Sequence, residues 1–394
     1  MLRLAPNPMH HGAVAVARSL GRIGAQVHGV VEGARTPFAR SRYCAGELRL
    51  DLGVVEADEL CARLLAWAEE TGRQPVLIPI DDAGAVFVAD RAGDLARSFR
   101  FPRQPEGLVR RLSSKLELYR LCLEHAIPTP ALHSPNGEDE LSAIGETVRY
   151  PVMIKRISEW TPTRQRGPRI AIAATVDELH ATFSAMRDDG APNLLIQEYI
   201  PEGDDWLFNG YFDEQSRCLF GATGRAIRQY PLGSGPTTLG ETRRNEVVRR
   251  RIVELLSTLG YRGIVDVDFR FDPRDGEYKL LDVNPRIGST FRLFATRAGT
   301  DVARALYFDL LGESFDQADP EDGRRWVVEN YDLAASLACR RAGGLSAAAW
   351  VRSFRGVREL AWASLDDPVP AAVAFATSVV TATRRVRTTR AAAQ

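Results

Sequence analysis

The N-terminal part of the chain alternates between segments of helical spacing and short apolar runs. Residues 13–25 and 57–72 place apolar side chains every three or four positions, which predicts two helices. Residues 26–32 and 75–80 are short and mostly apolar, which predicts two buried strands. Because strands that alternate with helices usually pair in parallel, we expect a parallel α/β layer over residues 1–105.

Two lysines occupy unusual places in the pattern that follows. Ser114 and Glu117 form a capping box, so a helix begins there and Lys115 lies in its first turn, where free N–H groups favour an anion. Residues 150–157 predict a strand that carries Lys155 within its apolar run. A buried ammonium is costly unless an anion pairs with it, so Lys155 either forms a structural salt bridge or binds a ligand. For Lys115 the alternative is an ordinary solvated lysine.

The middle of the chain predicts three more strands and a helix. Residues 194–200 are apolar and end in a Pro-Glu-Gly sequence, which indicates a strand followed by a turn. Residues 206–212 and 217–227 predict a hairpin about the polar residues 213–216. Residues 245–260 have helical spacing and end in glycine, so we expect a helix there.

Residues 263–286 predict a hairpin with an oxygen-rich face. Its first strand alternates valine and phenylalanine with charged residues, and Asp268 lies among the acids. Its second strand places Asp282 and Asn284 on one face, two residues apart. If the hairpin brings these three side chains together, their hard oxygen ligands suit Mg²⁺. An Asn-Pro-Arg sequence then ends the strand abruptly, which is unusual for a solvated sheet face.

For the other two acids of the first strand, Asp266 and Asp272, we expect a structural position and not a metal-binding role. We expect them to form the polar outer face of an antiparallel sheet.

Composition narrows the class of protein. With 394 residues, 45% hydrophobic and 26% charged, the chain is typical of a globular protein of two or three domains. Its 51 basic residues balance 51 acidic residues, so the net charge does not point to nucleic acid. Five scattered cysteines without a C-x-x-C pair indicate reduced thiols, so we expect a cytoplasmic protein.

The two ends of the chain show no membrane signal. The N-terminal segment has two prolines and two histidines before any apolar run, which is not expected of a signal peptide. Residues 369–383 form the longest apolar-leaning run, which is too short and too rich in hydroxyls to span a bilayer. Arginine-rich residues 384–390 follow it, so an amphipathic surface helix is the alternative to a packed helix with a solvated tail.

Taken in order, these segments resemble the ATP-grasp superfamily, specifically the carboxylate–amine ligases of the carbamoyl phosphate synthase-like and D-aspartate ligase-like branch. The order is a lysine that opens a helix ending in Ile-Pro-Thr-Pro, the strand with Lys155, the sequence IQEYIPEGDD, an aspartate-bearing strand and the sequence LLDVNPR. Each motif alone is weak, and the order and spacing carry the resemblance. The matching features run from Lys115 to about Gly312.

The resemblance implies an α/β (α+β) ATP-grasp fold of three parts. Residues 1–105 would form a Rossmann-like pre-ATP-grasp domain, and residues 106–312 the ATP-grasp domain with a lid subdomain at about 130–198. Residues 313–394 would form a small helical extension, whose tryptophans and arginines we expect to serve packing and surface.

The resemblance also implies roles for individual residues. The lysines would hold the ATP phosphates, a glutamate and two backbone groups the adenine, and an aspartate the ribose. This nucleotide-binding set is Lys115, Lys155, Glu198, Tyr199, Ile200 and Asp205. The implied magnesium ligands, with Mn²⁺ as an alternative ion, are Asp268, Asp282 and Asn284. Arg286 would face the transferred phosphoryl group or the substrate carboxylate, and Arg225 and Arg228 would contact phosphate or acyl phosphate.

Two departures from the family pattern matter. The usual glycine-rich loop after the strand lysine is replaced by the basic loop 156–169. Its arginines Arg164, Arg166 and Arg169 either clamp an anion or belong to a solvated loop. The usual glutamate of the Glu-x-Asn pattern is Asp282, which keeps the negative charge on a shorter side chain.

The implied activity is ligation. ATP would phosphorylate a carboxylate, and an amine, such as an amino acid or a small peptide, would attack the acyl phosphate to give an amide, ADP and phosphate. The alternatives are a carboxylase or carbamoyl-forming enzyme that acts through carboxyphosphate, and a nucleotide-binding sensor without ligase activity. The expected partners are small-molecule substrates and a second copy of the chain in a homodimer, with no nucleic acid and no membrane span.

Overall fold

The computed structural model describes residues 1–5, 7, 9–33, 36–52, 55–156, 170–187, 194–233 and 235–378. The chain divides into two compact units. Unit 1 comprises Met1–Ser113, Trp206–Val267 and Val283–Gln394, and unit 2 comprises Ser114–Asp205 and Asp268–Asp282. The three-part division expected from the sequence stays a prediction.

The N-terminal part of unit 1 has the expected parallel α/β arrangement. The helices α1 (His11–Gly21) and α2 (Ala57–Thr71) and the strand β1 (Val27–Val31) form where the pattern predicts them. β1 pairs in parallel with β2 (Cys44–Arg49), which was not predicted because its residues are mostly half-exposed and lack an apolar run. The predicted strand at 75–80 is extended but makes only isolated parallel bridges.

Short elements complete this part of unit 1. They are η1 (Phe38–Arg40), α3 (Asp82–Asp90), α4 (Ala92–Leu95) and α5 (Leu108–Ser113).

A seven-stranded sheet has the order β11-β10-β7-β8-β9-β12-β13. Its strands are β7 (Asp205–Phe212), β8 (Cys218–Gln229), β9 (Thr237–Thr242), β10 (Gly263–Asp272), β11 (Glu277–Asn284), β12 (Arg325–Val327) and β13 (Val357–Leu360). The predicted hairpin is confirmed, because β7 and β8 pair antiparallel and Asp213 accepts the backbone N–H groups of Gln215 and Arg217 in the turn. The accompanying helices are α9 (Glu246–Thr258), η2 (Phe291–Phe294), α10 (Val302–Leu311), α11 (Glu329–Arg341) and α12 (Ala347–Ser353).

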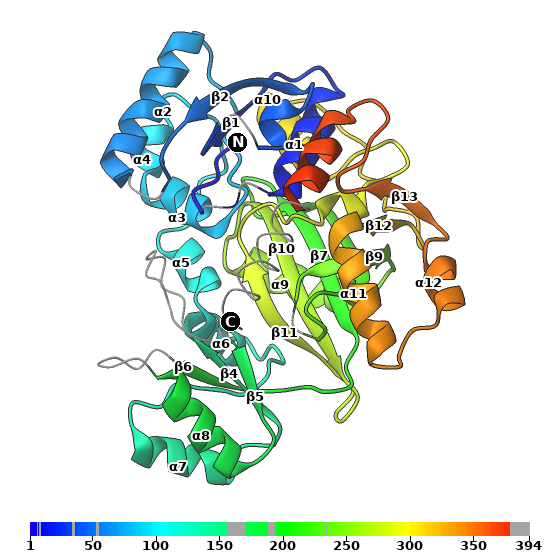
Figure 1. The fold of residues 1–394 in the computed structure, drawn as a ribbon. Helices are drawn as coiled ribbons and strands as arrows, with labels where there is room; N and C mark the ends of the chain where they lie inside the picture. The colour runs from blue at the N-terminus through cyan, green and yellow to red at the C-terminus, as the bar shows by residue number, and fades with distance from the viewer. Residues whose placement is uncertain are drawn as a thin grey trace, which may run out of the picture. The chain divides into compact units, whose positions relative to one another are not determined.

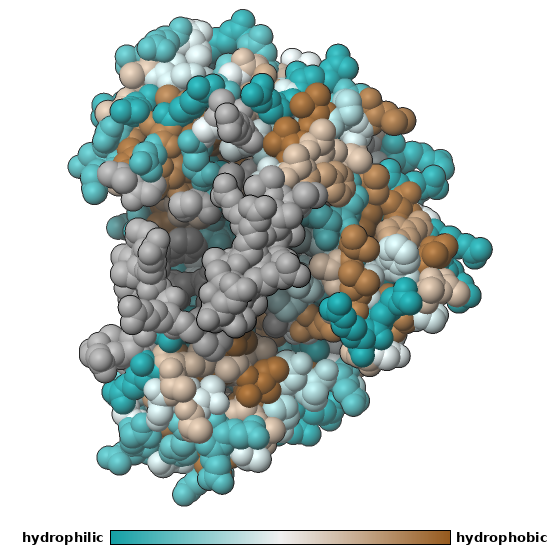
Figure 2. All heavy atoms as spheres, viewed as in Figure 1, coloured by the Kyte–Doolittle hydropathy of each residue, from teal (hydrophilic) through white to brown (hydrophobic). Residues whose placement is uncertain are grey.

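The segment after Gly312 is not purely helical as expected. It contains α11 and α12, but β12 also pairs antiparallel with β9, and β13 pairs in parallel with β12. Trp326 and Trp362 are 2% and 0% exposed, so they serve packing as expected. Figure 2 shows apolar residues on the surface where α11 lies in Figure 1, and Leu333 and Leu337 of that helix are exposed.

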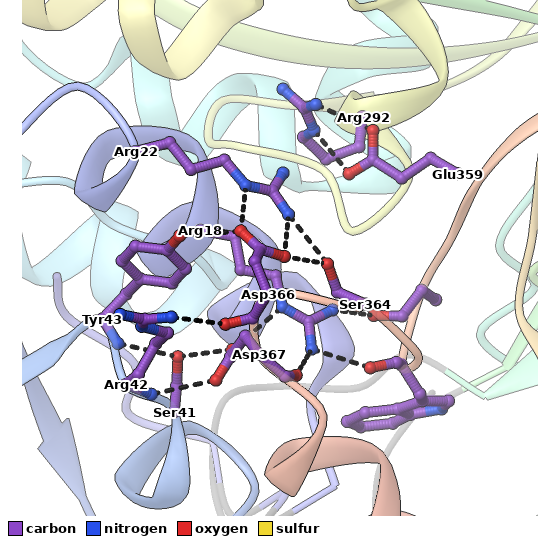
Figure 3. A network of polar contacts seen from close by, with 12 residues as sticks. Arg18, Arg22, Ser41, Arg42, Tyr43, Arg292, Glu359, Ser364, Asp366 and Asp367 are labelled. Atoms are coloured by element: carbon purple, nitrogen blue, oxygen red, sulfur yellow. Dashed lines mark hydrogen bonds and ion pairs between the residues drawn. The ribbon is translucent and has the colours of Figure 1, made fainter.

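Polar contacts, the innermost of them buried, fasten the end of this segment to α1 (Figure 3). The Arg18 guanidinium is 3% exposed and donates to the Asp367 carboxylate at 3.0 Å and to the Trp362 carbonyl at 2.8 Å. Arg22 and the Tyr43 hydroxyl both donate to the Asp366 carboxylate. The hydrogen bond from Arg22 is the main cause that holds the pKa of Asp366 well below its usual range. Residues 361–367 are therefore an integral part of unit 1.

Unit 2 contains a four-stranded antiparallel sheet of order β3-β6-β4-β5. Its strands are β3 (Leu132–His133), β4 (Val152–Arg156), β5 (Ile170–Ala173) and β6 (Leu194–Glu198), and its helices are α6 (Lys115–Glu124), α7 (Glu138–Thr147) and α8 (Val176–Met186). Figure 1 shows α7 and α8 side by side against this sheet, where they bury Leu141, Leu179 and Ile154. The predicted strands with Lys155 and Glu198 are therefore neighbours, β4 and β6.

Burial along β10 follows the predicted alternation up to Phe269 and then reverses, so that Phe271 is partly exposed and Asp272 is buried. The expectation of a solvated outer face is therefore wrong for both of its acids. The Asp266 side chain is 14% exposed and Asp272 is 0% exposed. Both carboxylates accept from cations, which makes their burial tolerable.

Across the part of the chain that the structure describes, the helices are too short or too polar to cross a membrane.

Candidate functional site

The first candidate phosphate ligand, Lys115, begins α6. The Ser114 hydroxyl accepts the backbone N–H of Glu117, as the capping box predicts, and this fixes the start of the helix at Lys115. The Lys115 ammonium lies 2.5 Å from a carboxylate oxygen of Asp282 on β11. A predicted phosphate ligand and a predicted metal ligand therefore meet within unit 2.

The second candidate phosphate ligand, Lys155, lines a pocket together with Lys115. Its ammonium donates to the Gln197 side-chain oxygen on β6 at 2.6 Å. Burial, reinforced by the charge of Lys115 and opposed by that of Asp282, lowers the pKa of Lys155 to about 8. Lys115, Lys155 and Gln197 line one pocket together with apolar residues such as Leu195. An anion in this pocket would relieve the unfavourable charge of Lys155, so a polyphosphate fits the residues present.

Glu198, the candidate adenine ligand, ends β6 and is already engaged by two cations. Its Oε1 accepts from Arg274 at 2.6 Å, and its Oε2 lies 3.4 Å from the Lys279 ammonium. The Ala131 backbone N–H also donates to Oε2, at 3.4 Å. The side chain is 14% exposed. Sequence reasoning identified Glu198 but neither of its cationic partners.

The residues after Glu198 form a tight connection. The Tyr199 backbone N–H donates to the Pro151 carbonyl at 3.3 Å, and Ile200 is 2% exposed. The candidate ribose ligand Asp205 accepts from Arg270 at 2.8 Å. A side chain at Gly203 would lie 2.3 Å from the Phe271 carbonyl, so only glycine allows this connection to pack against β10.

The predicted metal ligands fall in both units. Asp268 and Asp282 belong to unit 2, on the neighbouring strands β10 and β11, while Asn284 belongs to unit 1. No group of three or more His, Cys, Asp or Glu that could hold a metal occurs among the described residues. Within unit 2 the carboxylates of Asp268 and Asp282 would supply two hard oxygen ligands, and with oxygen atoms of substrate and water they make an ordinary donor set for magnesium.

Arg286 is the centre of a polar cluster in unit 1. Its guanidinium donates to Asp82 at 3.0 Å and to the Asn284 side-chain oxygen at 3.0 Å, and it lies 3.5 Å from Asp266. Asn209 donates to the other oxygen of Asp266 at 3.1 Å. Only Asn284 and Arg286 were candidates from sequence, because Asp82 and Asn209 come from segments that carry no recognisable motif.

Glycine and histidine complete the surroundings of this cluster. A side chain at Gly288 would lie 2.2 Å from the Asp266 carboxyl carbon, so glycine is required for that close approach. His10 caps α1, where it accepts the backbone N–H of Ala13. Burial first, and then the charges of His11, Arg3 and Arg286, lower the pKa of His10 to about 3, so the imidazole stays neutral.

The two arginines of β8 differ in their surroundings. Arg225 is half-buried, and its guanidinium carbon lies 5.7 Å from the Trp206 ring centre. Arg228 is 6% exposed, and two of its nitrogens donate to Asp332 of α11, each at 2.8 Å. Its third nitrogen donates to Ser353 at 2.9 Å. We leave Arg228 out of the proposed catalytic set, because its guanidinium is engaged in holding α11.

The arginines of the basic loop, Arg164, Arg166 and Arg169, lie outside the described residues.

Part of the chain is similar in sequence to known ATP-binding proteins and ligases. The family model of the carbamoyl-phosphate synthase L chain, ATP binding domain, matches residues 223–307. D-aspartate ligase of Enterococcus faecium (strain Aus0004) is 27% identical over 260 residues, which are 61% of this chain and 59% of that protein. The chain thus spans less than two thirds of this relative's length.

Solved structures have the same fold. L-amino acid ligase from Bacillus licheniformis superposes with a TM-score of 0.61 at 15% identity, over 80% of this chain and 76% of that one. The biotin carboxylase domain dimer of 2-oxoglutarate carboxylase from Hydrogenobacter thermophilus, in complex with MgADP, ADP and bicarbonate, gives 0.57 at 17% identity, over 80% and 71%. The resemblance to the ATP-grasp superfamily is confirmed, and the chain has an ATP-grasp fold.

Proposed function

We propose, from its ATP-grasp fold, that this chain is an ATP- and magnesium-dependent ligase that joins a carboxylate to an amine and forms ADP and phosphate. The observation that carries the proposal is the Lys155 ammonium in the pocket of unit 2, beside Lys115 and with its pKa lowered to about 8. A buried ammonium whose charge is disfavoured does not stabilise the fold, whereas a bound polyphosphate would turn the charge of Lys155 into a favourable contact.

The proposed chemistry is phosphoryl transfer followed by attack of the amine. Lys115 and Lys155 hold the phosphates, Glu198 accepts from the adenine amino group, and Asp205 binds the ribose. Asp268, Asp282 and Asn284 would hold magnesium, which would supply positive charge to the phosphates. The protein residues then serve positioning and charge neutralisation, without a covalent nucleophile.

The polar cluster around Arg286 in unit 1 supports the proposed class of substrate. A guanidinium can bind a carboxylate or an acyl phosphate, while the carboxylates of Asp82 and Asp266 can accept from an ammonium group. This combination favours an amino acid or a small peptide as substrate. The names of two similar proteins, a D-aspartate ligase and an L-amino acid ligase, support this substrate class.

The proposal also covers the oligomeric state of the protein and its place in the cell. We propose a homodimer in the cytoplasm, where ATP is plentiful and cysteines stay reduced. The similar biotin carboxylase domain forms a dimer, and this supports the first part. Light scattering of the purified protein gives the mass that tests it.

The decisive experiment measures ADP release from ATP and Mg²⁺ across amino-acid mixtures, with and without bicarbonate. We expect turnover that depends on an amine and a carboxylate and does not need bicarbonate, with an amide product detected by mass spectrometry. Turnover that requires bicarbonate would instead support the carboxylase or carbamoyl-forming alternative. Tight ATP binding without turnover in any mixture would support a sensor.

A further inference from the structure

A buried carboxylate lies in the turn that joins β10 to β11. Asp272 is 0% exposed, and each of its oxygens accepts two hydrogen bonds or ion pairs. Oδ1 accepts from the Arg274 backbone N–H at 3.0 Å and from its Nε at 2.7 Å. Oδ2 accepts from Arg274 Nη2 at 2.6 Å and lies 2.8 Å from the Lys279 ammonium. These contacts fix both cations in place.

The same two cations reach Glu198. Arg274 Nη2 lies 2.6 Å from its Oε1, and the Lys279 ammonium lies 3.4 Å from its Oε2. Arg274 and Lys279 are 16% and 10% exposed, so water screens these contacts only weakly. Two carboxylates and two cations, all within unit 2, thus form one group that we call the hinge cluster: Glu198, Asp272, Arg274 and Lys279.

The hinge cluster offsets the desolvation of Glu198 that binding of a base would cause. A purine against Glu198 removes the remaining water from a carboxylate that is already only 14% exposed. An ionised carboxylate without water or a partner is costly and tends to take up a proton, after which it accepts hydrogen bonds poorly. Arg274 and Lys279 give the Glu198 carboxylate two cationic partners that remain when water is removed. Because a carboxylate oxygen can accept two hydrogen bonds, Oε1 can accept from a base amino group as well as from Arg274.

We propose that Asp272, Arg274 and Lys279 are positioning residues that hold the Glu198 carboxylate in place as a hydrogen-bond acceptor, and so select a purine with an exocyclic amino group over one with a carbonyl oxygen. The inference rests on the proposed nucleotide site. It extends that site by three residues that no motif contains, and it names the property that they control, which is base selectivity. The carbonyl oxygen of hypoxanthine would meet a carboxylate and be repelled, whereas the amino group of adenine would donate to it.

The test compares dissociation constants for MgATP, MgITP and inorganic tripolyphosphate, measured by titration calorimetry on the full chain. We expect the wild-type protein to bind MgATP about tenfold or more tightly than MgITP, as a hydrogen bond to a charged group allows. Arg274→Met should reduce this ratio at least about fivefold and leave tripolyphosphate binding unchanged, because tripolyphosphate has no base. Arg274→Lys should recover part of the ratio, and Asp272→Asn should lower it if the variant folds.

Asp275→Asn is the matched control. Asp275 lies on the same turn and 2.9 Å from the Lys279 ammonium, but its side chain is 44% exposed. It should keep the wild-type ratio of the two nucleotides. Equal binding of MgATP and MgITP by the wild type, or an unchanged ratio in Arg274→Met, would overturn the inference while leaving the nucleotide site intact. A wild-type protein that binds neither nucleotide would contradict the proposed function itself and remove the basis of this inference.

Discussion

Binding of a polyphosphate to the pocket of Lys115 and Lys155 should be accompanied by proton uptake at mildly alkaline pH. Burial and the neighbouring charge of Lys115 lower the pKa of Lys155 to about 8. A bound anion removes the disadvantage of the charged form and should return this pKa towards the ordinary value for lysine, about 10.4. The lowered pKa corresponds to an unfavourable free energy on the order of 3 kcal/mol for the charged form.

The expected uptake follows from the two protonation states. At pH 8 a group with a pKa of about 8 is about half protonated, whereas a group with a pKa near 10.4 is almost fully protonated. Binding at pH 8 should therefore take up about 0.5 proton per site, and binding at pH 6.5 less than about 0.1. The uptake should rise with pH across this interval, in step with the deprotonation of Lys155 in the free protein.

Titration calorimetry with MgADP measures this uptake. The apparent binding enthalpy, plotted against the ionisation enthalpy of several buffers at one pH, has a slope equal to the number of protons exchanged. ADP is suitable because it does not turn over. Measurements at pH 6.5, 7.3 and 8.0 give the pH dependence that the argument requires.

Variants of the lysines identify the side chain that takes up the proton. Lys155→Met should abolish the uptake, and Lys115→Met should reduce it, because loss of the neighbouring charge raises the pKa of Lys155. Lys279→Met is a charge-matched control that leaves Lys115 and Lys155 in place, so the uptake at saturating MgADP should remain. Tight MgADP binding without uptake at pH 8, or full uptake in Lys155→Met, would refute the reasoning.

Three further predictions concern other parts of the molecule. Asp282→Ala should abolish ADP release while circular dichroism stays unchanged, and normal activity in this variant would exclude the metal role. Arg228→Met should lower the free energy of unfolding by about 3–5 kcal/mol, because it leaves the buried Asp332 carboxylate without its cation, and urea titration measures this loss. Asp366, whose pKa is held well below its usual range, contributes stability that is complete above about pH 4–5 and is lost at lower pH. Acid unfolding of wild type and Asp366→Asn should therefore diverge above pH 4 and converge below it.

Much of the candidate nucleotide site follows from local rules. The capping box places Lys115 at the start of α6, and the apolar run of β4 implies that Lys155 is costly to bury. The turn at Asp213 joins the hairpin of β7 and β8 as its residues predict. Each of these features depends on residues a few positions apart, and hydrogen bonds within a turn or a cap are determined at that distance.

Other features depend on partners that are remote in the sequence. Arg228 could be read as a phosphate ligand, but its partner Asp332 lies 104 residues further along the chain. Asp272 could be read as a solvated acid, but Arg274 and Lys279 make its burial favourable. The strands β12 and β13 are short, and β12 becomes a strand by pairing with β9. A pattern of single residues does not contain these pairings.

The sequence by itself determined the ATP-grasp resemblance, the order of the elements and the lysines of the candidate phosphate pocket, because spacing, capping and strand alternation are local. Only the tertiary structure decided which charges neutralise one another. It joined Glu198 to Arg274, Arg286 to Asp82, and Arg18 to Asp367. The physical reason is that the energy of a buried charge depends on the few ångströms around it, and folding fills that space with residues from distant parts of the chain.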